Sequence, residues 1–98
     1  MARWQVYILG CADGTLYSGV TNDLARRLRQ HLDGRASRYT RSRLPVHVVH
    51  SEPASNRGAA LRREAAIKAL ARSEKLAIIA HGVTARAGRS AERSRRAP

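Results

Sequence analysis

The sequence predicts an α+β fold in which three short strands and three helices make one small domain. Valine, tyrosine and isoleucine around Tyr7 favour a strand, and Asp13-Gly14 supplies the residues that a tight hairpin turn needs. A leucine at every fourth position from Leu24 then indicates an amphipathic helix. The beginning of the chain is therefore expected to form a compact β-β-α unit.

Residues 3–10 are expected to form the first strand and residues 16–20 its partner. Side chains alternate between the faces of a strand, so Tyr7 is expected to point away from the most apolar side. On the second strand Tyr17 and Gly19 share one face, and the glycine leaves room for a close approach to the backbone.

Residues 23–32 are expected to form the first helix, with Thr21 or Asn22 capping its free N–H groups. The leucines face the core, while Arg27 and His31, four residues apart, form an adjacent stripe. Two phenols, a guanidinium and an imidazole are thus supplied by one small unit.

Residues 34–45 are expected to be irregular, and they carry several arginines around Tyr39. Such a loop suits contact with phosphates, although a solvated loop in a basic protein has a similar composition. Residues 46–51 are expected to form a third strand. His47 and His50 are three residues apart and should point to opposite faces, which favours structural histidines over metal ligands.

Residues 57–71 are expected to form the second helix and residues 74–80 the third. Glu64 falls in the middle of the apolar stripe of the second helix, where a carboxylate is costly unless it is paired or binds a cation. An ion pair with Arg63, Lys68 or an arginine of the first helix satisfies this requirement as well as a metal ion does. The residues alone leave both readings open.

The chain has 19 Lys and Arg against seven Asp and Glu, a formal net charge of +12. This excess predicts a nucleic-acid partner, because phosphates supply the missing counter-charge. A merely basic, arginine-biased protein is the alternative. Residues 1–82 are expected to form the folded domain, and residues 83–98 a disordered, arginine-rich tail that adds non-specific phosphate affinity.

Cys11 is the one cysteine, so no internal disulfide forms, and it has no neighbours at metal-ligand spacing. A reducing cytoplasm is the expected location. The longest wholly apolar run, residues 76–80, is far too short to span a bilayer, and the N-terminus lacks the apolar region of a signal peptide. Neither a membrane nor an obligate protein partner is therefore expected.

Phosphodiester hydrolysis needs an activated water, a cation for the phosphate charge and stabilisation of the leaving oxygen. A guanidinium such as that of Arg27 lowers the pKa of a nearby phenol and also binds phosphate oxygens. A lone carboxylate such as Glu64 suits Mg²⁺ (or Mn²⁺), which keeps most of its waters. These groups suffice for a one-metal nuclease, and no glycine-rich phosphate loop or serine-hydrolase elbow competes.

The region from about residue 4 to residue 80 resembles the GIY-YIG nuclease superfamily, in particular its small stand-alone bacterial branch. The first motif tripeptide reads Gln5-Val6-Tyr7 here, and the second reads Tyr17-Ser18-Gly19. The resemblance is carried further by Arg27, His31 and Glu64, and by the segments A-D-G-T-L-Y-S-G-V-T-N-D-L-A-R-R-L-R-Q-H and A-L-R-R-E-A-A-I-K.

The resemblance implies a three-stranded antiparallel sheet flanked by helices, and Mg²⁺-dependent cleavage of DNA. It implies that Tyr7 or Tyr17 activates or positions the water and that Arg27 contacts the scissile phosphate. His31 is implied to assist proton transfer or phosphate binding, Glu64 to hold the metal ion, and Gly19 to let the phosphate approach. Further substrate contacts are expected from Arg26, Arg35, Arg38, Tyr39 and Arg41.

Three functions are compatible with these residues. The first is a metal-dependent, structure-selective endonuclease that acts on DNA in repair or recombination. The second is a non-catalytic nucleic-acid-binding protein on the same fold, and the third is an interaction module. A binder has no use for a carboxylate on a buried stripe or for two phenols aimed at one phosphate, so the nuclease is the expected function.

Overall fold

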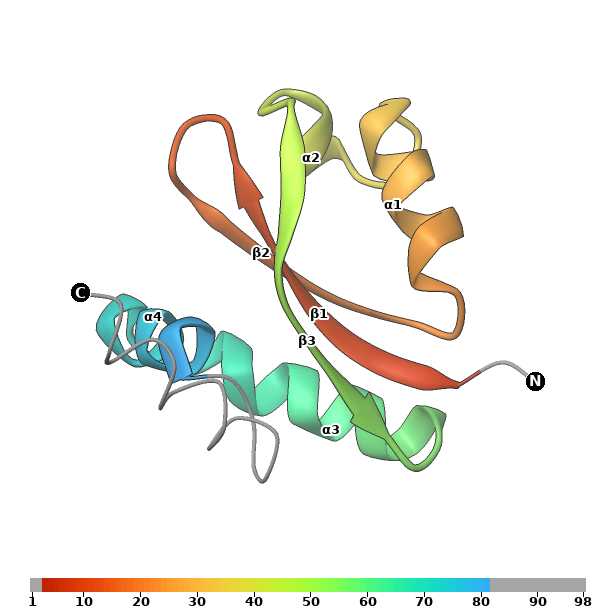
Figure 1. The fold of residues 1–98 in the computed structure, drawn as a ribbon, viewed down its shortest axis with the longest axis vertical. Coiled ribbons are helices and arrows are strands. Elements are labelled where there is room, and N and C mark those ends of the chain that lie inside the picture. Colours follow the sequence, from red (N-terminus) through yellow and green to blue (C-terminus); the bar gives the residue numbers. More distant parts are fainter. Residues whose placement is uncertain (1–2, 82–98) are drawn as a thin grey trace. The chain divides into compact units, whose positions relative to one another are not determined.

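The computed structural model describes residues 3–81 (Figure 1). Residues 3–68 belong to one compact unit and residues 69–81 to another, and each unit is described by itself. The expected tail at residues 83–98 lies outside the described residues. The first unit contains β1 (Trp4–Cys11), β2 (Leu16–Thr21), α1 (Leu24–Leu32), α2 (Arg38–Arg41), β3 (Val46–Ala54) and α3 (Arg57–Lys68), and the second contains α4 (Arg72–His81).

The three strands form one antiparallel sheet in the order β2-β1-β3, which confirms the predicted architecture. β1 and β2 are joined by the expected turn, where Gly14 has a positive φ of 85°. The carboxylate of Asp13 accepts hydrogen bonds from the backbone N–H of Thr15, at 3.0 Å, and from its hydroxyl, at 2.6 Å. This local bonding closes the hairpin and sets the register of β1 on β2.

The cap of α1 differs from the expected one. Asp23 is the N-cap, and its carboxylate accepts a hydrogen bond from the N–H of Arg26 at 3.1 Å. Thr21 lies one step back, and its hydroxyl accepts from the N–H of Asp23 at 3.0 Å. The Thr21 hydroxyl and the Asp23 carboxylate therefore stabilise the turn that leads from β2 into α1.

Both faces of the sheet are buried, which corrects the expectation that Tyr7 points away from the most apolar side. One face carries a core of Tyr7, Leu9, Cys11 and Val46, against which Leu24 and Leu28 of α1 pack. α3 covers the other face with the buried residues Ala60 and Ile67 (Figure 1). Because the sheet is covered twice, alternation along β1 does not separate a core face from a solvent face.

A β-bulge in β3 changes the faces of its histidines. Ile8 pairs with His50 and Leu9 with Val48, so one residue of β3 is left over between them. His47 pairs with Gly10, and His50 with Ile8, so the two histidines share a face. The expectation that they point to opposite faces is wrong, because it assumes an unbroken alternation.

The helices differ from expectation mainly in the segment at residues 34–45, which was expected to be irregular. This segment contains α2, capped by Ser37, whose hydroxyl accepts from the N–H of Thr40 at 3.2 Å. α3 ends at Lys68 instead of residue 71, and α4 begins at Arg72. Within residues 3–81, no helix is long and apolar enough to cross a membrane.

Candidate active site

Tyr7 and His31 form a buried polar pair between β1 and α1. The Tyr7 hydroxyl lies 2.9 Å from Nε2 of His31, and the two rings meet edge to face. Tyr7 is 1% exposed and His31 is fully buried. Strand and helix thus hold a phenol and an imidazole in a fixed hydrogen bond away from bulk solvent.

Tyr17 and Gly19 complete this arrangement from β2. Tyr7 is the cross-strand partner of Gly19, and Tyr17 is the partner of Leu9, so both tyrosines project from the same face. The Tyr17 ring lies 5.3 Å from the His31 ring, centroid to centroid. A Cβ at residue 19 would stand 2.5 Å from the Tyr7 hydroxyl oxygen. The group that approaches the Gly19 backbone is therefore the Tyr7 ring, and a phosphate contact there stays a prediction.

Thr40, on α2, fixes the other nitrogen of the His31 ring. Its hydroxyl oxygen lies 2.8 Å from His31 Nδ1 and 3.4 Å from the carbonyl oxygen of Ser37. If the single hydroxyl hydrogen is donated to Ser37, Nδ1 carries a proton and Nε2 is left to accept from Tyr7. Sequence reasoning did not single out Thr40, because its contact with His31 depends on how α2 packs on α1.

Arg27 presents an unused donor beside this pair. Its Nη1 donates to the side-chain oxygen of Gln30 at 3.0 Å. Its Nε is buried and has no hydrogen-bond partner among the residues that the structure describes. A buried guanidinium N–H without a protein acceptor is suited to an anionic oxygen, as of a phosphate.

Burial sets the protonation of the pair. Burial raises the pKa of Tyr7, and the Arg27 guanidinium opposes this without reversing it; the Tyr17 phenol and the Glu64 carboxylate raise that pKa further. The Arg27 guanidinium lowers the pKa of Tyr7, as expected of a nearby guanidinium, but burial outweighs this effect and the net shift is upward. Burial and the Arg27 charge lower the pKa of His31. At neutral pH Tyr7 is therefore protonated and His31 is uncharged.

Glu64 lies on α3, the helix that covers the other face of the sheet, and its place in the same site stays a prediction. Its charge contributes to the pKa of Tyr7, which places the carboxylate within electrostatic range of the phenol. Its Oε2 lies 3.3 Å from Nζ of Lys68, one turn further along α3. The Glu64 side chain is 17% exposed and that of Lys68 is 56% exposed. The sequence left open whether Glu64 forms an ion pair or binds a metal ion, and the structure contains an ion pair with Lys68. An ion pair with so exposed a lysine is weak.

A metal ion remains compatible with these residues. No group of three His, Cys, Asp or Glu side chains able to hold a metal occurs in the part of the chain described, residues 3–81. A single carboxylate nevertheless suits Mg²⁺, which usually keeps several waters and takes only one or two protein ligands. The donor chemistry of Glu64 therefore fits an ion of this kind.

A family model described as the GIY-YIG catalytic domain matches residues 3–77. This chain belongs to the GIY-YIG family. The resemblance noted in the sequence is thereby confirmed.

The GIY-YIG relatives include many UPF0213 proteins. One from Xanthomonas axonopodis pv. citri is 47% identical over 74 residues, covering 76% of this chain and 72% of the relative. Another, from Natronomonas pharaonis, is 45% identical over 79 residues, which cover 81% of this chain and 93% of the relative. The solution NMR structure of a UPF0213 protein from Bacillus halodurans has a TM-score of 0.54 at 33% identity, covering 89% of this chain and 92% of that one.

The arginines expected to contact a substrate lie on or near α1 and α2. Arg35 forms an exposed ion pair with Asp33 at 3.1 Å. The remaining expected arginines, Arg26 of α1 with Arg38 and Arg41 of α2, are exposed. Their contact with a substrate stays a prediction.

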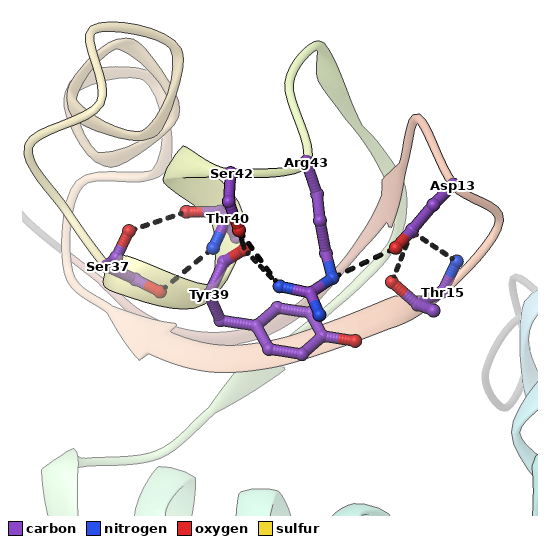
Figure 2. Close-up of polar contacts among 7 residues, drawn as sticks. All are labelled: Asp13, Thr15, Ser37, Tyr39, Thr40, Ser42 and Arg43. Atoms are coloured by element: carbon purple, nitrogen blue, oxygen red, sulfur yellow. Dashed lines mark hydrogen bonds and ion pairs between the residues drawn. The ribbon is translucent and has the colours of Figure 1, made fainter.

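Tyr39 and Arg43 tie α2 to the β1–β2 turn (Figure 2). Arg43 donates to the Asp13 carboxylate at 2.9 Å, and its guanidinium lies 3.8 Å from the centre of the Tyr39 ring. The other neighbour of this ring is Tyr17, stacked at 5.9 Å. Contact of Tyr39 with a substrate stays a prediction. Sequence reasoning treated Asp13 and Arg43 only as turn and loop residues and did not predict their contact.

A second buried polar cluster lies on the face of the sheet that α3 covers. The Glu52 carboxylate lies 2.7 Å from His50 Nε2 and accepts from Arg63 Nε at 2.7 Å. Burial raises the pKa of Glu52, but these hydrogen bonds and charges outweigh it and hold that pKa below its usual value. The cluster includes none of the expected site residues, and it joins β3 to α3.

Proposed function

We propose that this protein is a metal-dependent endonuclease that hydrolyses phosphodiester bonds in DNA. The observation that carries the proposal is the Tyr7–His31 hydrogen bond of 2.9 Å, which lies beside the unpaired Nε of Arg27. Tyr7, Tyr17, Arg27, His31 and Glu64 come from the four elements β1, β2, α1 and α3, and all of them influence or contact Tyr7 or His31. These influences support a site in which a proton acceptor, a phosphate ligand and a carboxylate for a metal ion act on one substrate.

The proton path follows from the protonation states. The Tyr7 oxygen accepts a proton from the attacking water while its own proton passes to Nε2 of the uncharged His31. The oxygen of the water bonds to phosphorus as the bond to the leaving oxygen breaks, and the leaving oxygen takes a proton from solvent. In this path the Thr40 hydroxyl donates to the carbonyl of Ser37 and accepts from Nδ1–H of His31, so Nε2 is the acceptor.

Arg27 binds the phosphate in this proposal. Its Nε has no hydrogen-bond partner among residues 3–81, and a guanidinium forks onto two phosphate oxygens. Glu64 would hold Mg²⁺ or Mn²⁺, which when bound supplies Lewis-acid stabilisation of the leaving oxygen. Lys68 would release the carboxylate when a metal ion binds, since the Lys68 side chain is more than half exposed.

Exposed arginines extend the contact to the DNA backbone. Arg26, Arg35, Arg38 and Arg41 lie on or beside α1 and α2, the helices that also carry His31 and Thr40. Phosphate contacts of this type position a substrate without reading its sequence. We therefore propose selection by DNA structure, as repair and recombination require.

Cleavage assays with the purified chain test this function. End-labelled single strands, flaps, forks and duplexes are incubated with and without Mg²⁺ or Mn²⁺. We expect metal-dependent cuts that disappear in Glu64→Gln and Arg27→Ala and persist in the controls Glu74→Gln and Arg29→Ala, which remove the same charges at exposed positions. Equal cutting by the Glu64→Gln protein would mean that another site, or a contaminant, is responsible.

A non-catalytic nucleic-acid binder is the second candidate. The Glu64–Lys68 ion pair favours it, because a paired carboxylate needs no metal ion. Salt-sensitive binding without cleavage under any divalent ion, unchanged by Glu64→Gln, would support this candidate.

A further inference from the structure

A pocket beside the candidate active site has no role in the proposal above. It has a volume of about 260 Å³ and opens between the end of β2, the start of α1 and the first residue of β1. Arg27 belongs both to the pocket and to the surroundings of Tyr7. The pocket is lined by Trp4, Val20, Thr21, Asn22, Asp23, Arg26, Arg27 and Gln30.

The lining combines one aromatic wall with hydrogen-bonding side chains. Trp4 offers the large flat surface, and it is the only tryptophan in the chain. Gln30 is held by Arg27, which donates to its oxygen, so its amide N–H groups remain as donors. Asn22 adds a second amide with both donors and acceptors. A planar ring with polar edges matches these groups better than an aliphatic or purely anionic ligand does.

The charge and the size of the pocket also favour a nucleotide. Two arginines and one aspartate line the pocket, so its net charge favours a ligand that carries a phosphate. Its volume of about 260 Å³ lies just below the range of about 300–1,000 Å³ that is usual for small-ligand pockets. A pocket of this size suits a small ligand such as a single base.

We propose that this pocket binds the base of an unpaired nucleotide next to the phosphate held by Arg27. The position of that phosphate rests on the proposed nuclease function, whereas the base-binding pocket does not. A base inside a duplex is stacked on both sides and cannot reach Trp4 without leaving the helix. The substrate class that follows is DNA with an unpaired nucleotide at the cut, as in single strands, flaps and bulges.

Fluorescence of Trp4 tests the pocket without any cleavage. Because Trp4 is the only tryptophan, emission excited selectively in the indole band reports on this wall alone. The full chain carrying Glu64→Gln is titrated, without a divalent ion, with a short single-stranded oligonucleotide and with an abasic strand of the same length. We expect saturable quenching by the strand with bases and at least several-fold weaker quenching by the abasic strand at saturation. Equal quenching by both strands, or no quenching at saturation, overturns the proposal.

Cleavage gives the second readout. A duplex with one bulged nucleotide is compared with the same duplex in which that nucleotide is abasic, using wild type, Trp4→Phe and Trp4→Leu. Stacking on an aromatic side chain contributes about 1–3 kcal/mol per base, which corresponds to about five- to 150-fold. We expect Trp4→Leu to slow cutting of the base-containing bulge by a factor in this range and to leave the abasic bulge unchanged, while Trp4→Phe retains most of the preference.

The two failures are separable. Base-dependent quenching without cleavage would remove the nuclease function and leave the pocket standing. Cleavage that is equally fast on base-containing and abasic bulges, with base-independent quenching, would remove the pocket and leave the nuclease. Circular dichroism of Trp4→Leu shows whether that variant folds, and the fluorescence titration does not depend on it.

Discussion

The phenol of Tyr7 lies directly over Gly19, so that a Cβ at residue 19 would stand 2.5 Å from the hydroxyl oxygen and 2.6 Å from Cζ. Gly19 of β2 therefore leaves the space that the Tyr7 ring occupies when it bonds to His31. No side chain fits there unless the ring moves.

Gly19→Ala is expected to displace Tyr7 from His31. Overpacking of this kind costs about 1–3 kcal/mol of unfolding free energy, and the proton path is broken as well. We expect cleavage to fall by at least tenfold, with DNA affinity largely retained. Gly58→Ala in α3 is the matched control, since its Cβ would meet only side-chain atoms at 3.4 Å. Wild-type cleavage by Gly19→Ala would contradict the role given to the Tyr7–His31 pair.

Thr40→Val should release His31 without changing the shape of the site. The variant removes the hydroxyl that lies 2.8 Å from Nδ1, which leaves a buried ring nitrogen unpaired at a cost of about 1–3 kcal/mol of stability. We expect kcat to fall while KM changes little, because Thr40 acts through His31 and does not touch the phosphate. Thr40→Ser keeps the hydroxyl and should restore the rate; a Ser variant as slow as Val would argue against the hydrogen bond.

The pH dependence of the reaction should follow His31. Burial lowers its pKa below the usual 6.5, so the uncharged acceptor persists in acid. As the pH falls, His31 takes up a proton in the unfolded chain at a higher pH than in the folded protein. The stability that neutral His31 contributes is therefore complete above pH 6.5 and is lost as the pH falls toward the folded pKa of His31. We expect the acid limb of kcat to lie below pH 6.5, and a limb at or above that pH would contradict the assignment.

Lys68→Ala should make the Glu64 carboxylate more available to a metal ion. An ion pair with so exposed a lysine is worth about 0.2–1 kcal/mol, so the metal concentration for half-maximal activity is expected to fall by up to about fivefold. A metal titration of the cleavage rate measures this. Lys68→Arg keeps the pair and serves as the control, and an unchanged midpoint in Lys68→Ala would indicate that Glu64 does not hold the ion.

Glu52→Gln should destabilise the fold without touching the chemistry. Glu52 is buried between His50 and Arg63, and removing its charge weakens both contacts, for a loss of about 1–3 kcal/mol in urea unfolding. The pKa of Glu52 is lower in the folded protein than in the unfolded chain. The stability that the Glu52 carboxylate contributes is therefore fully present above its unfolded pKa, and it is lost as the pH falls through its folded pKa. Glu74→Gln is the exposed control, and equal stability of the two variants would contradict a supporting role for this cluster.

Local patterns in the sequence were enough for most of the fold. The Asp13-Gly14 turn, the leucines of α1 and the strand-forming residues around Tyr7 each act over a few residues, so each element could be predicted from its own segment. The bulge in β3 and the short helix α2 could not be predicted in this way. Each depends on what the segment packs against, and the bulge reversed the expected faces of His47 and His50.

The sequence by itself determined which functional groups this protein has: two tyrosines near one turn, Arg27 and His31 one helical turn apart, and Glu64 on an apolar stripe. Only the tertiary structure decided how they act. It placed Tyr7 over Gly19, closed the contact of Thr40 with His31 and buried the phenol, so that the pKa of Tyr7 is raised where the local charge of Arg27 alone predicted a lower one. Burial and side-chain orientation are properties of all the elements that surround a residue, and no short stretch of sequence contains them.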